Sequence, residues 1–185
     1  MKQAAFRILA ASILASGVWA RSSEVGKRAE NQQDRIAQGI HSGQLTAGET
    51  ANLEKKETAI NQEVRVDRSL NGGHLTQGER QVVNSQQNQT SNQIYKDKHN
   101  TTTQHYGNNE VDGRRENQQD RIAKGVASGK LSAAQTARLE KGEAAINRET
   151  RADRSANGGH LTAGEKKTIN RQQNVESGRI YRAKH

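Results

Sequence analysis

The chain of 185 residues contains no cysteine and no proline, has 3% aromatic residues and carries a formal net charge of +9. The absence of cysteine excludes disulfides, thiol chemistry and cysteine-ligated metal sites, and the few large apolar side chains leave little surface for a core. The positive charge attracts anionic partners, but nucleic acid is not expected among them, because aromatic stacking platforms and concentrated basic runs are missing.

Residues 1–20 (MKQAAFRILAASILASGVWA) have the three parts of a secretory signal peptide. Lys2 and Arg7 make the start positive, residues 8–18 form an apolar run, and Val18 and Ala20 place small side chains at the two positions that a signal peptidase reads. The run is shorter than the roughly 20 residues that span a membrane. We therefore expect a periplasmic or secreted protein whose mature part has neither a lipid anchor nor a transmembrane segment.

The rest of the chain is a duplication. The string ENQQDRIA at 30–37 returns at 116–123, which is 86 residues later, and roughly 44 of 70 aligned positions are identical. We expect two copies of one helical module, residues 21–99 and residues 116–185. The segment between them, residues 100–115, is rich in Asn, Thr and Gly and has no apolar period, which is typical of a flexible polar linker.

A shorter pattern, Gly-x-Leu-[Ser/Thr]-x-x-[Glu/Gln], occurs twice in each module. Its second half is a capping box, in which the hydroxyl accepts from a backbone N–H of the first turn and the residue three positions later bonds to the N–H of the cap. The glycine ahead of it suits the left-handed residue that ends the preceding helix. Each pattern therefore predicts a helix end, a short turn and a helix start. The predicted caps are Thr46, Thr76, Ser132 and Thr162, and their partners are Glu49, Glu79, Gln135 and Glu165.

These turns divide each module into three helices, so the predicted fold class is all-α. In the first module the helices run near residues 29–42, 47–66 and 77–98, and apolar residues recur along each of them at helical spacing. The apolar stripe is thin, so we expect small, marginally packed domains. The third helix has the polar string QQN between its apolar positions, which favours a partly exposed helix stabilised by a partner or a second copy.

Two stretches resemble the first half of an EF-hand calcium loop, which uses oxygen ligands at alternate positions before a turn glycine. The second half is out of phase, because the glutamate falls at position 13 of the stretch, where the loop requires position 12. Few negative ligands in a basic chain also disfavour calcium. A structural turn is the preferred interpretation, and degenerate EF-hand-like calcium binding is the alternative. The candidate ligands are Asp67, Ser69 and Asn71 in the first module and Asp153, Ser155 and Asn157 in the second.

The six histidines and the many Ser, Thr, Asp and Glu residues form no catalytic or metal-ligating pattern. The chain has no His-x-His or His-x-x-x-His spacing and no nucleophile elbow, phosphate loop or zinc-peptidase motif. We expect the histidines to be exposed turn and terminal residues. We assign no catalytic, cofactor-binding or metal-binding residues, and we expect no enzymatic activity.

The repeated strings ENQQDRIA, NGGHLT and QQN with IYxxKH resemble a group of small exported bacterial proteins that carry one or two copies of this module. The resemblance covers residues 27–99 and 113–185. It implies a bacterial, Gram-negative origin and a periplasmic or secreted location, and it brings no catalytic residues. The Leu-Thr-x-x-Glu element is also loosely similar to the Leu-Thr-x-x-Gln motif of periplasmic Spy-like chaperones, which are basic, helical and free of cysteine.

Together these features favour a non-enzymatic exported helical protein that binds macromolecules or anionic envelope surfaces, with a stress-related or chaperone-like role. Two modules on a flexible linker would bind bivalently. A third hypothesis is a chain that is disordered until it meets its partner. The partner, the oligomeric state and the packing of the two modules against each other are open at this level.

Overall fold

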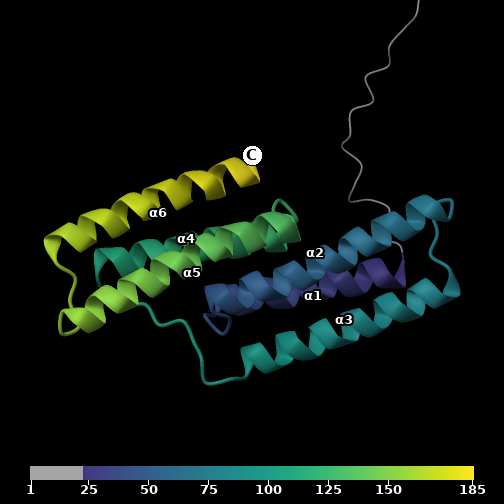
Figure 1. Cartoon of the computed structure of the whole chain (residues 1–185), viewed down its shortest axis with the longest axis horizontal. Helices are drawn as coiled ribbons and strands as arrows, with labels where there is room; N and C mark the ends of the chain where they lie inside the picture. The colour runs from purple at the N-terminus through teal and green to yellow at the C-terminus, as the bar shows by residue number, and fades with distance from the viewer. Residues whose placement is uncertain (1–22) are drawn as a thin grey trace, which may run out of the picture.

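Residues 23–185 are described by the computed structural model, and they form six α-helices and no strand (Figure 1). The helices are α1 (Glu24–His41), α2 (Ala47–Leu70), α3 (Gln77–Lys98), α4 (Glu110–Ala127), α5 (Ala133–Ala156) and α6 (Ala163–Lys184). The all-α prediction is confirmed for this part of the chain, and no helix in it has the length and apolar character needed to cross a membrane. The predicted signal peptide, residues 1–20, lies outside the described residues.

Helices α4, α5 and α6 begin and end 86 residues after α1, α2 and α3. We call α1–α3 the first half of the chain and α4–α6 the second half. The predicted start of α2 at Ala47 and both ends of α3 are confirmed. Helix α2 continues to Leu70, beyond its predicted end at residue 66, so the turn that follows it is short.

The predicted starts of α1 and α4 are wrong because two polar caps lie ahead of them. Ser23 accepts a hydrogen bond from the Gly26 N–H at 3.1 Å, so α1 begins at Glu24 and not near residue 29. Asn109 accepts from the Asp112 N–H at 3.1 Å, so residues 110–115, which composition assigns to the linker, are helical. Both helices begin with a polar cap and a mostly polar first turn. Apolar periodicity therefore does not reveal where they start.

All four predicted capping boxes are present. Gly43 and Gly129, which precede α2 and α5, have φ angles of 70° and 66°, in the left-handed region that favours glycine. Leu45 and Leu131 follow these glycines and are buried. The chemistry of the turn therefore sets the direction in which the chain enters α2 and α5.

Glutamine side chains fasten α3 to α1. Gln87 is buried, its side-chain amide donates to the Val25 carbonyl at 2.9 Å, and its backbone carbonyl accepts from the Gln32 side-chain amide at 2.7 Å. Arg35 donates to the Ser91 hydroxyl at 2.6 Å. In the second half the same bonds join Gln173 to Val111, Gln118 to Gln173 and Arg121 to Ser177. The repeated polar strings are thus part of the packing, and α1 provides the contacts for which we expected a partner.

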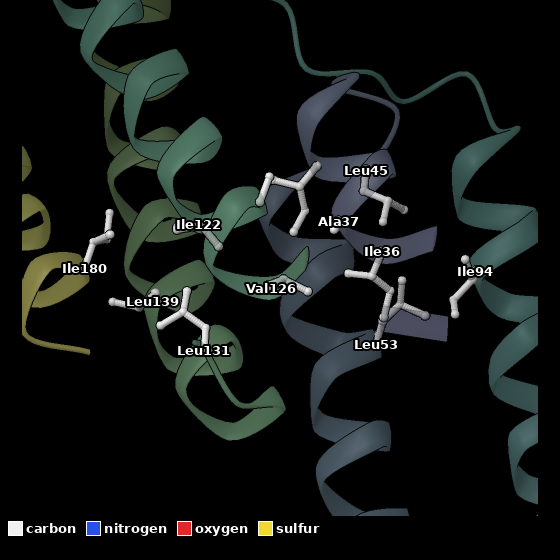
Figure 2. Packing of buried hydrophobic residues seen from close by; sticks show 12 residues of the cluster. Ile36, Ala37, Leu45, Leu53, Ile94, Ile122, Val126, Leu131, Leu139 and Ile180 are labelled. Atoms are coloured by element: carbon white, nitrogen blue, oxygen red, sulfur yellow. The ribbon is translucent and has the colours of Figure 1, made fainter. Parts of the chain in front are cut away.

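One apolar core joins the two halves. Helix α1 packs against α4 and α2 packs against α5, while α3 and α6 lie on opposite outer sides of these four helices (Figure 1). Figure 2 shows side chains of a single cluster that extends from Ile180 of α6 to Ile94 of α3. Ile36, Leu53 and Ile122, which belong to the same cluster, have no exposed surface. The two halves therefore pack on each other, which the sequence leaves open.

The segment between α3 and α4, residues 99–109, is bonded to both halves. The Gln104 N–H donates to the Gly43 carbonyl of the first half at 2.8 Å, and its side chain accepts from Arg115 of the second half at 3.1 Å. The Arg115 guanidinium also lies over the Tyr106 ring, 5.4 Å from its centroid. These contacts hold the segment against the helices.

The variant Gly39→Ala is expected to lower the stability of the protein. A Cβ at Gly39 would lie 2.6 Å from Cγ and Cδ1 of Leu45, which is a core residue with no exposed surface. Overpacking of this kind costs about 1–3 kcal/mol in the free energy of unfolding. Urea unfolding followed by circular dichroism measures the effect.

The variant Gly113→Ala in α4 is the matched control, because no atom lies within 4 Å of the added Cβ. It should raise the free energy of unfolding by roughly 0.5–1 kcal/mol through the higher helix propensity of alanine. If the Gly39 variant were as stable as the Gly113 variant, the result would contradict the close packing of Leu45 against Gly39 of α1.

Candidate functional site

The candidate calcium ligands of the two stretches do not lie in a loop. Asp67 and Ser69 lie inside α2, where residues two apart do not face each other, and the Ser69 hydroxyl donates to the Val66 carbonyl at 2.6 Å. Asn71 is the C-cap of the helix. Asp153, Ser155 and Asn157 occupy the same places at the end of α5. The structure therefore does not bring the carboxylate and hydroxyl ligands of either set together.

Glu79, which would complete the first calcium loop, belongs to the cap of α3. Its carboxylate accepts from the Thr76 N–H at 2.7 Å and from the side-chain amide of Asn71 at 2.8 and 3.0 Å. The backbone hydrogen bond from Thr76 is the main reason why the pKa of Glu79 lies below its ordinary value. The second half repeats this arrangement with Glu165, Thr162 and Asn157. Both carboxylates are thus already used by the turn.

All six histidines are exposed, as the sequence predicts. His99 stacks on Tyr95 with ring centroids 4.2 Å apart, and His41 Nδ1 lies 3.0 Å from Asp120 Oδ1, across the two halves. Within residues 23–185, no three His, Asp or Glu side chains are grouped in a way that could hold a metal ion. The histidines therefore have the contacts of surface side chains.

A group of glutamates lies buried in the interior around α2 and α5. Glu54 and Glu57 of α2, and Glu140 and Glu143 of α5, have no exposed surface. Each pair is three residues apart, which places both carboxyls on one face of the helix. Glu176 of α6 is 2% exposed and raises the pKa of Glu140 and Glu143 through its charge. We call these five side chains the carboxyl cluster.

The carboxyl cluster has few hydrogen-bond partners. The Gln33 amide of α1 donates to Glu54 Oε2 and the Gln119 amide of α4 donates to Glu140 Oε2, both at 3.0 Å. The other carboxyl oxygen of Glu54 and of Glu140 has no protein partner among the described residues. A buried carboxylate without partners is strongly disfavoured, so this environment favours the neutral acid.

Burial raises the pKa of the carboxyls in the cluster. It raises the pKa of Glu54 and Glu143 to about 8 and that of Glu57 to about 7. The pKa of Glu140 lies well above its ordinary value, first because of burial and then because Glu143 and Glu54 are acids close to it. Glu54 and Glu140 belong to different halves, so carboxyls of the two halves meet in this cluster.

Other titratable groups near the cluster come from α4 and from the segment before it. The charges of Arg115 and Arg121 of α4 lower the pKa of Glu143, against the larger effect of burial. Tyr106 has a buried hydroxyl without a hydrogen-bond partner within residues 23–185, and burial raises its pKa. The five carboxyls of the cluster therefore outnumber the positive groups close to them.

The net charge of the described residues is carried by the second half. Residues 23–109 contain ten basic and ten acidic side chains, so their formal net charge is zero. Residues 110–185 contain sixteen basic and ten acidic side chains, which gives a net charge of +6. The two halves have matching helices, but only the second half has a net positive charge that attracts an anionic partner.

Several of these basic side chains line a groove between α5 and α6. The groove consists of two open parts of about 360 and 470 Å³, both of which are lined by Glu176 and Arg179. Arg138, Arg171 and Arg182 also line it and are exposed. Arg179 donates to Glu176 at 2.9 Å. Guanidinium groups bind phosphate and carboxylate with two parallel hydrogen bonds, so the groove has the chemistry of an anion-binding surface.

The first half has no equivalent of this surface. Asn52, Ser85, Gln93 and Lys96 take the places of Arg138, Arg171, Arg179 and Arg182. Three of the four arginines are thus replaced by neutral side chains. The basic groove therefore belongs to the second half alone.

Comparison of the chain with protein-family models, with curated proteins and with solved structures finds no match. The function must therefore be argued from the carboxyl cluster and the basic groove, neither of which we assign from the sequence. The sequence does hold a signal for each. Glu54 and Glu57 share a helical face with Leu53, and a comparison of the two copies position by position shows the added arginines of α6.

Calcium is expected to leave the melting temperature unchanged. The carboxylate of Glu79 is already bonded to Thr76 and Asn71, and Asp67 lies on α2, so calcium has no loop to enter. Thermal melts followed by circular dichroism, in millimolar calcium and in EDTA, make the comparison. A melting temperature that rises with calcium, and no longer rises in the variant Asp67→Ala with Asp153→Ala, would restore the calcium hypothesis.

Proposed function

We propose that this chain is a non-enzymatic exported helical protein that binds anionic macromolecules or anionic surfaces of the bacterial envelope. The observation that carries the proposal is the confinement of the net charge of +6 to the second half, with four arginines along the α5–α6 groove. An anionic partner would approach this face, because the first half has no net charge to attract it.

The composition of the groove supports binding to phosphate or carboxylate groups. Each basic side chain near an anionic bilayer contributes about 1 kcal/mol to association at moderate salt. The apolar part of the groove lining comes from Leu139, Ala145, Ile146, Val175 and Ala183. Apolar surface beside guanidinium groups suits an amphipathic partner, such as a lipid headgroup region or an acidic protein segment.

The non-enzymatic part of the proposal is supported by the location of the perturbed acids. Strongly shifted pKa values often mark catalytic residues. Here the most shifted carboxyls, among them Glu54 and Glu140, have no exposed surface, so a substrate cannot contact them in this arrangement. We propose no cofactor for the protein.

The exported location is proposed from the signal-like character of residues 1–20 and from the resemblance to small exported bacterial proteins. A stress-related or chaperone-like role belongs to the same proposal. It is supported by the basic, helical and cysteine-free character of the chain.

The mode of binding that we propose uses one face of the molecule. Two independent sites on a flexible linker would give bivalent attachment, but the two halves share one apolar core and only the second half has the basic groove. The first half then acts as the support that completes the core beneath α4 and α5.

Removal of three arginines from the groove is expected to weaken binding to anionic vesicles. The variant Arg138→Gln, Arg171→Gln, Arg182→Gln loses three positive charges from exposed positions. Affinity for phosphatidylglycerol vesicles should fall roughly 100-fold at low salt, at about 1 kcal/mol per charge. Co-sedimentation with phosphatidylglycerol and phosphatidylcholine vesicles, at low and high salt, measures the difference.

The matched control is Lys55→Gln, Lys56→Gln, Arg65→Gln, which loses the same charge from exposed positions of α2. It should retain most of the affinity, because these residues lie outside the groove. Binding to a phosphorylated polysaccharide but not to vesicles would identify a glycan as the partner. The absence of salt-sensitive binding to both, with no effect of the protein in an aggregation assay, would refute the proposed function.

A further inference from the structure

The contact between α2 and α5 brings together two acids that the basic groove does not use. We propose that protonation of Glu54 and Glu140 controls the docking of the two halves, which stay together while these carboxyls are neutral and separate when the carboxyls ionise. Both carboxyls lie in the interior of the protein and act independently of any partner of the groove.

Both carboxyls lie on a stripe of small buried side chains. On α2 the stripe consists of Ala47, Ala51 and Glu54, at positions i, i+4 and i+7 of the helix, and all three are buried. On α5 it consists of Ala133, Ala137 and Glu140, which are also buried. Small side chains let two helices approach closely, and α2 packs along α5. The two carboxyls therefore meet where the halves are in contact.

Neither carboxyl has a compensating charge. Among the ion pairs of residues 23–185, none includes Glu54 or Glu140. Each accepts one hydrogen bond from a glutamine of its own half, Gln33 or Gln119, and has a second oxygen without a protein partner. Ionisation would leave two unpaired negative charges in a buried contact, which disfavours the docked state.

The elements packed around the pair do not supply the missing positive charge. On α6, Arg179 pairs with Glu176 at 2.9 Å. The other titratable groups around Glu54 and Glu140 are Glu57 on α2, Glu143 on α5, Arg115 and Arg121 on α4 and Tyr106 in the segment before α4. The two arginines act on Glu143, and Arg115 also pairs with Asp112 at 3.1 Å. Arg35 of α1 donates to Ser91 of α3.

The direction of the pH effect follows from the buried state of the acids. The docked protein binds protons more tightly than a separated state in which the carboxyls contact water, because burial raises the pKa of Glu54 from 4.5 to about 8 and that of Glu140 in the same direction. Docking is therefore strongest below about pH 4.5 and weakens as the pH rises through about 8. A salt-bridged carboxylate would give the opposite dependence.

Each half retains contacts of its own when the halves separate. The first half has a separate apolar cluster of Val25, Ile60, Leu75 and Val83, and the second half has one of Val111, Ile146 and Ile169. The capping boxes and the glutamine bonds between α1 and α3, or α4 and α6, also lie within one half. Helices should therefore persist while the shared core opens.

The test measures the distance between α2 and α5 as a function of pH. Lys55→Cys and Lys141→Cys introduce exposed labelling sites at equivalent positions of the two helices in a chain without other cysteines. With spin labels attached, the distance should increase as the pH rises from about 5 to about 9, while circular dichroism remains helical. In the same labelled chain, Glu54→Gln with Glu140→Gln should reduce the increase in distance, since glutamine imitates the neutral acid and only the raised pKa values of Glu57, Glu143 and Glu176 then remain.

The control is Glu30→Gln with Glu116→Gln, at exposed and equivalent positions of α1 and α4, which should respond to pH as the parent chain does. A distance that does not change with pH, or one that increases only as helicity is lost, would overturn the proposal. If the glutamine variant does not fold, the melting temperature of the unmodified protein decides. It must fall between about pH 5 and about pH 9, and a constant or rising value would also overturn the inference.

Discussion

The contact between the two halves, in which α1 packs against α4 and α2 packs against α5, is the interaction on which the rest of the structure depends. The apolar cluster that contains Ile36 and Ile122 is made from both halves, so neither half covers its own largest buried side chains. Where α2 packs on α5, the charge of Glu54 raises the pKa of Glu140, and neither acid has an ion-pair partner within residues 23–185. The interface between the halves thus contains both the main apolar core and buried acids whose ionisation is disfavoured. Ionisation of these acids would leave buried charges without partners and would therefore oppose the contact between the halves.

Polar side chains do in this protein what apolar ones do in most helical domains. The chain has few large apolar residues, and α3 is held to α1 by the paired glutamines Gln32 and Gln87 and by Arg35. A single hydrogen bond contributes only about 0.5–1.5 kcal/mol, so these bonds add less stability than a leucine core would. They do fix the register of the two helices, because each amide has one backbone carbonyl to reach. Neutral amides also avoid the desolvation penalty that the buried carboxyls incur.

The features that the sequence predicts correctly are local ones. The capping boxes at Thr46 and Thr76 involve residues three positions apart, and their residue types alone determine the hydrogen bonds. The cap at Asn109 is equally local, but no apolar period follows it and composition assigns it to a linker. The burial of Glu54 is not local, since it depends on a helix that begins more than sixty residues later. A glutamate on an apolar helical face is ordinarily a surface residue, and only the tertiary contact with the other half makes it a buried acid.

The difference between the two copies distinguishes residues of the fold from residues of the surface. The glutamine bonds and the buried glutamates of α2 and α5 are the same in both halves, so they are explained by packing. The caps keep their hydrogen bonds although Ser132 and Gln135 replace Thr46 and Glu49. The α5–α6 groove differs in a correlated way, because Glu176 and Gly142 replace Thr90 and Lys56 of the first half. A Cβ at Gly142 would lie 2.7 Å from the carboxyl of Glu176, so the glycine leaves room for the glutamate side chain in its present position. Glu176 in turn accepts from Arg179 at 2.9 Å, which fixes one guanidinium of the groove. The basic surface is therefore accompanied by matched changes beneath it, and these hold one of its arginines in place as the proposed binding surface needs.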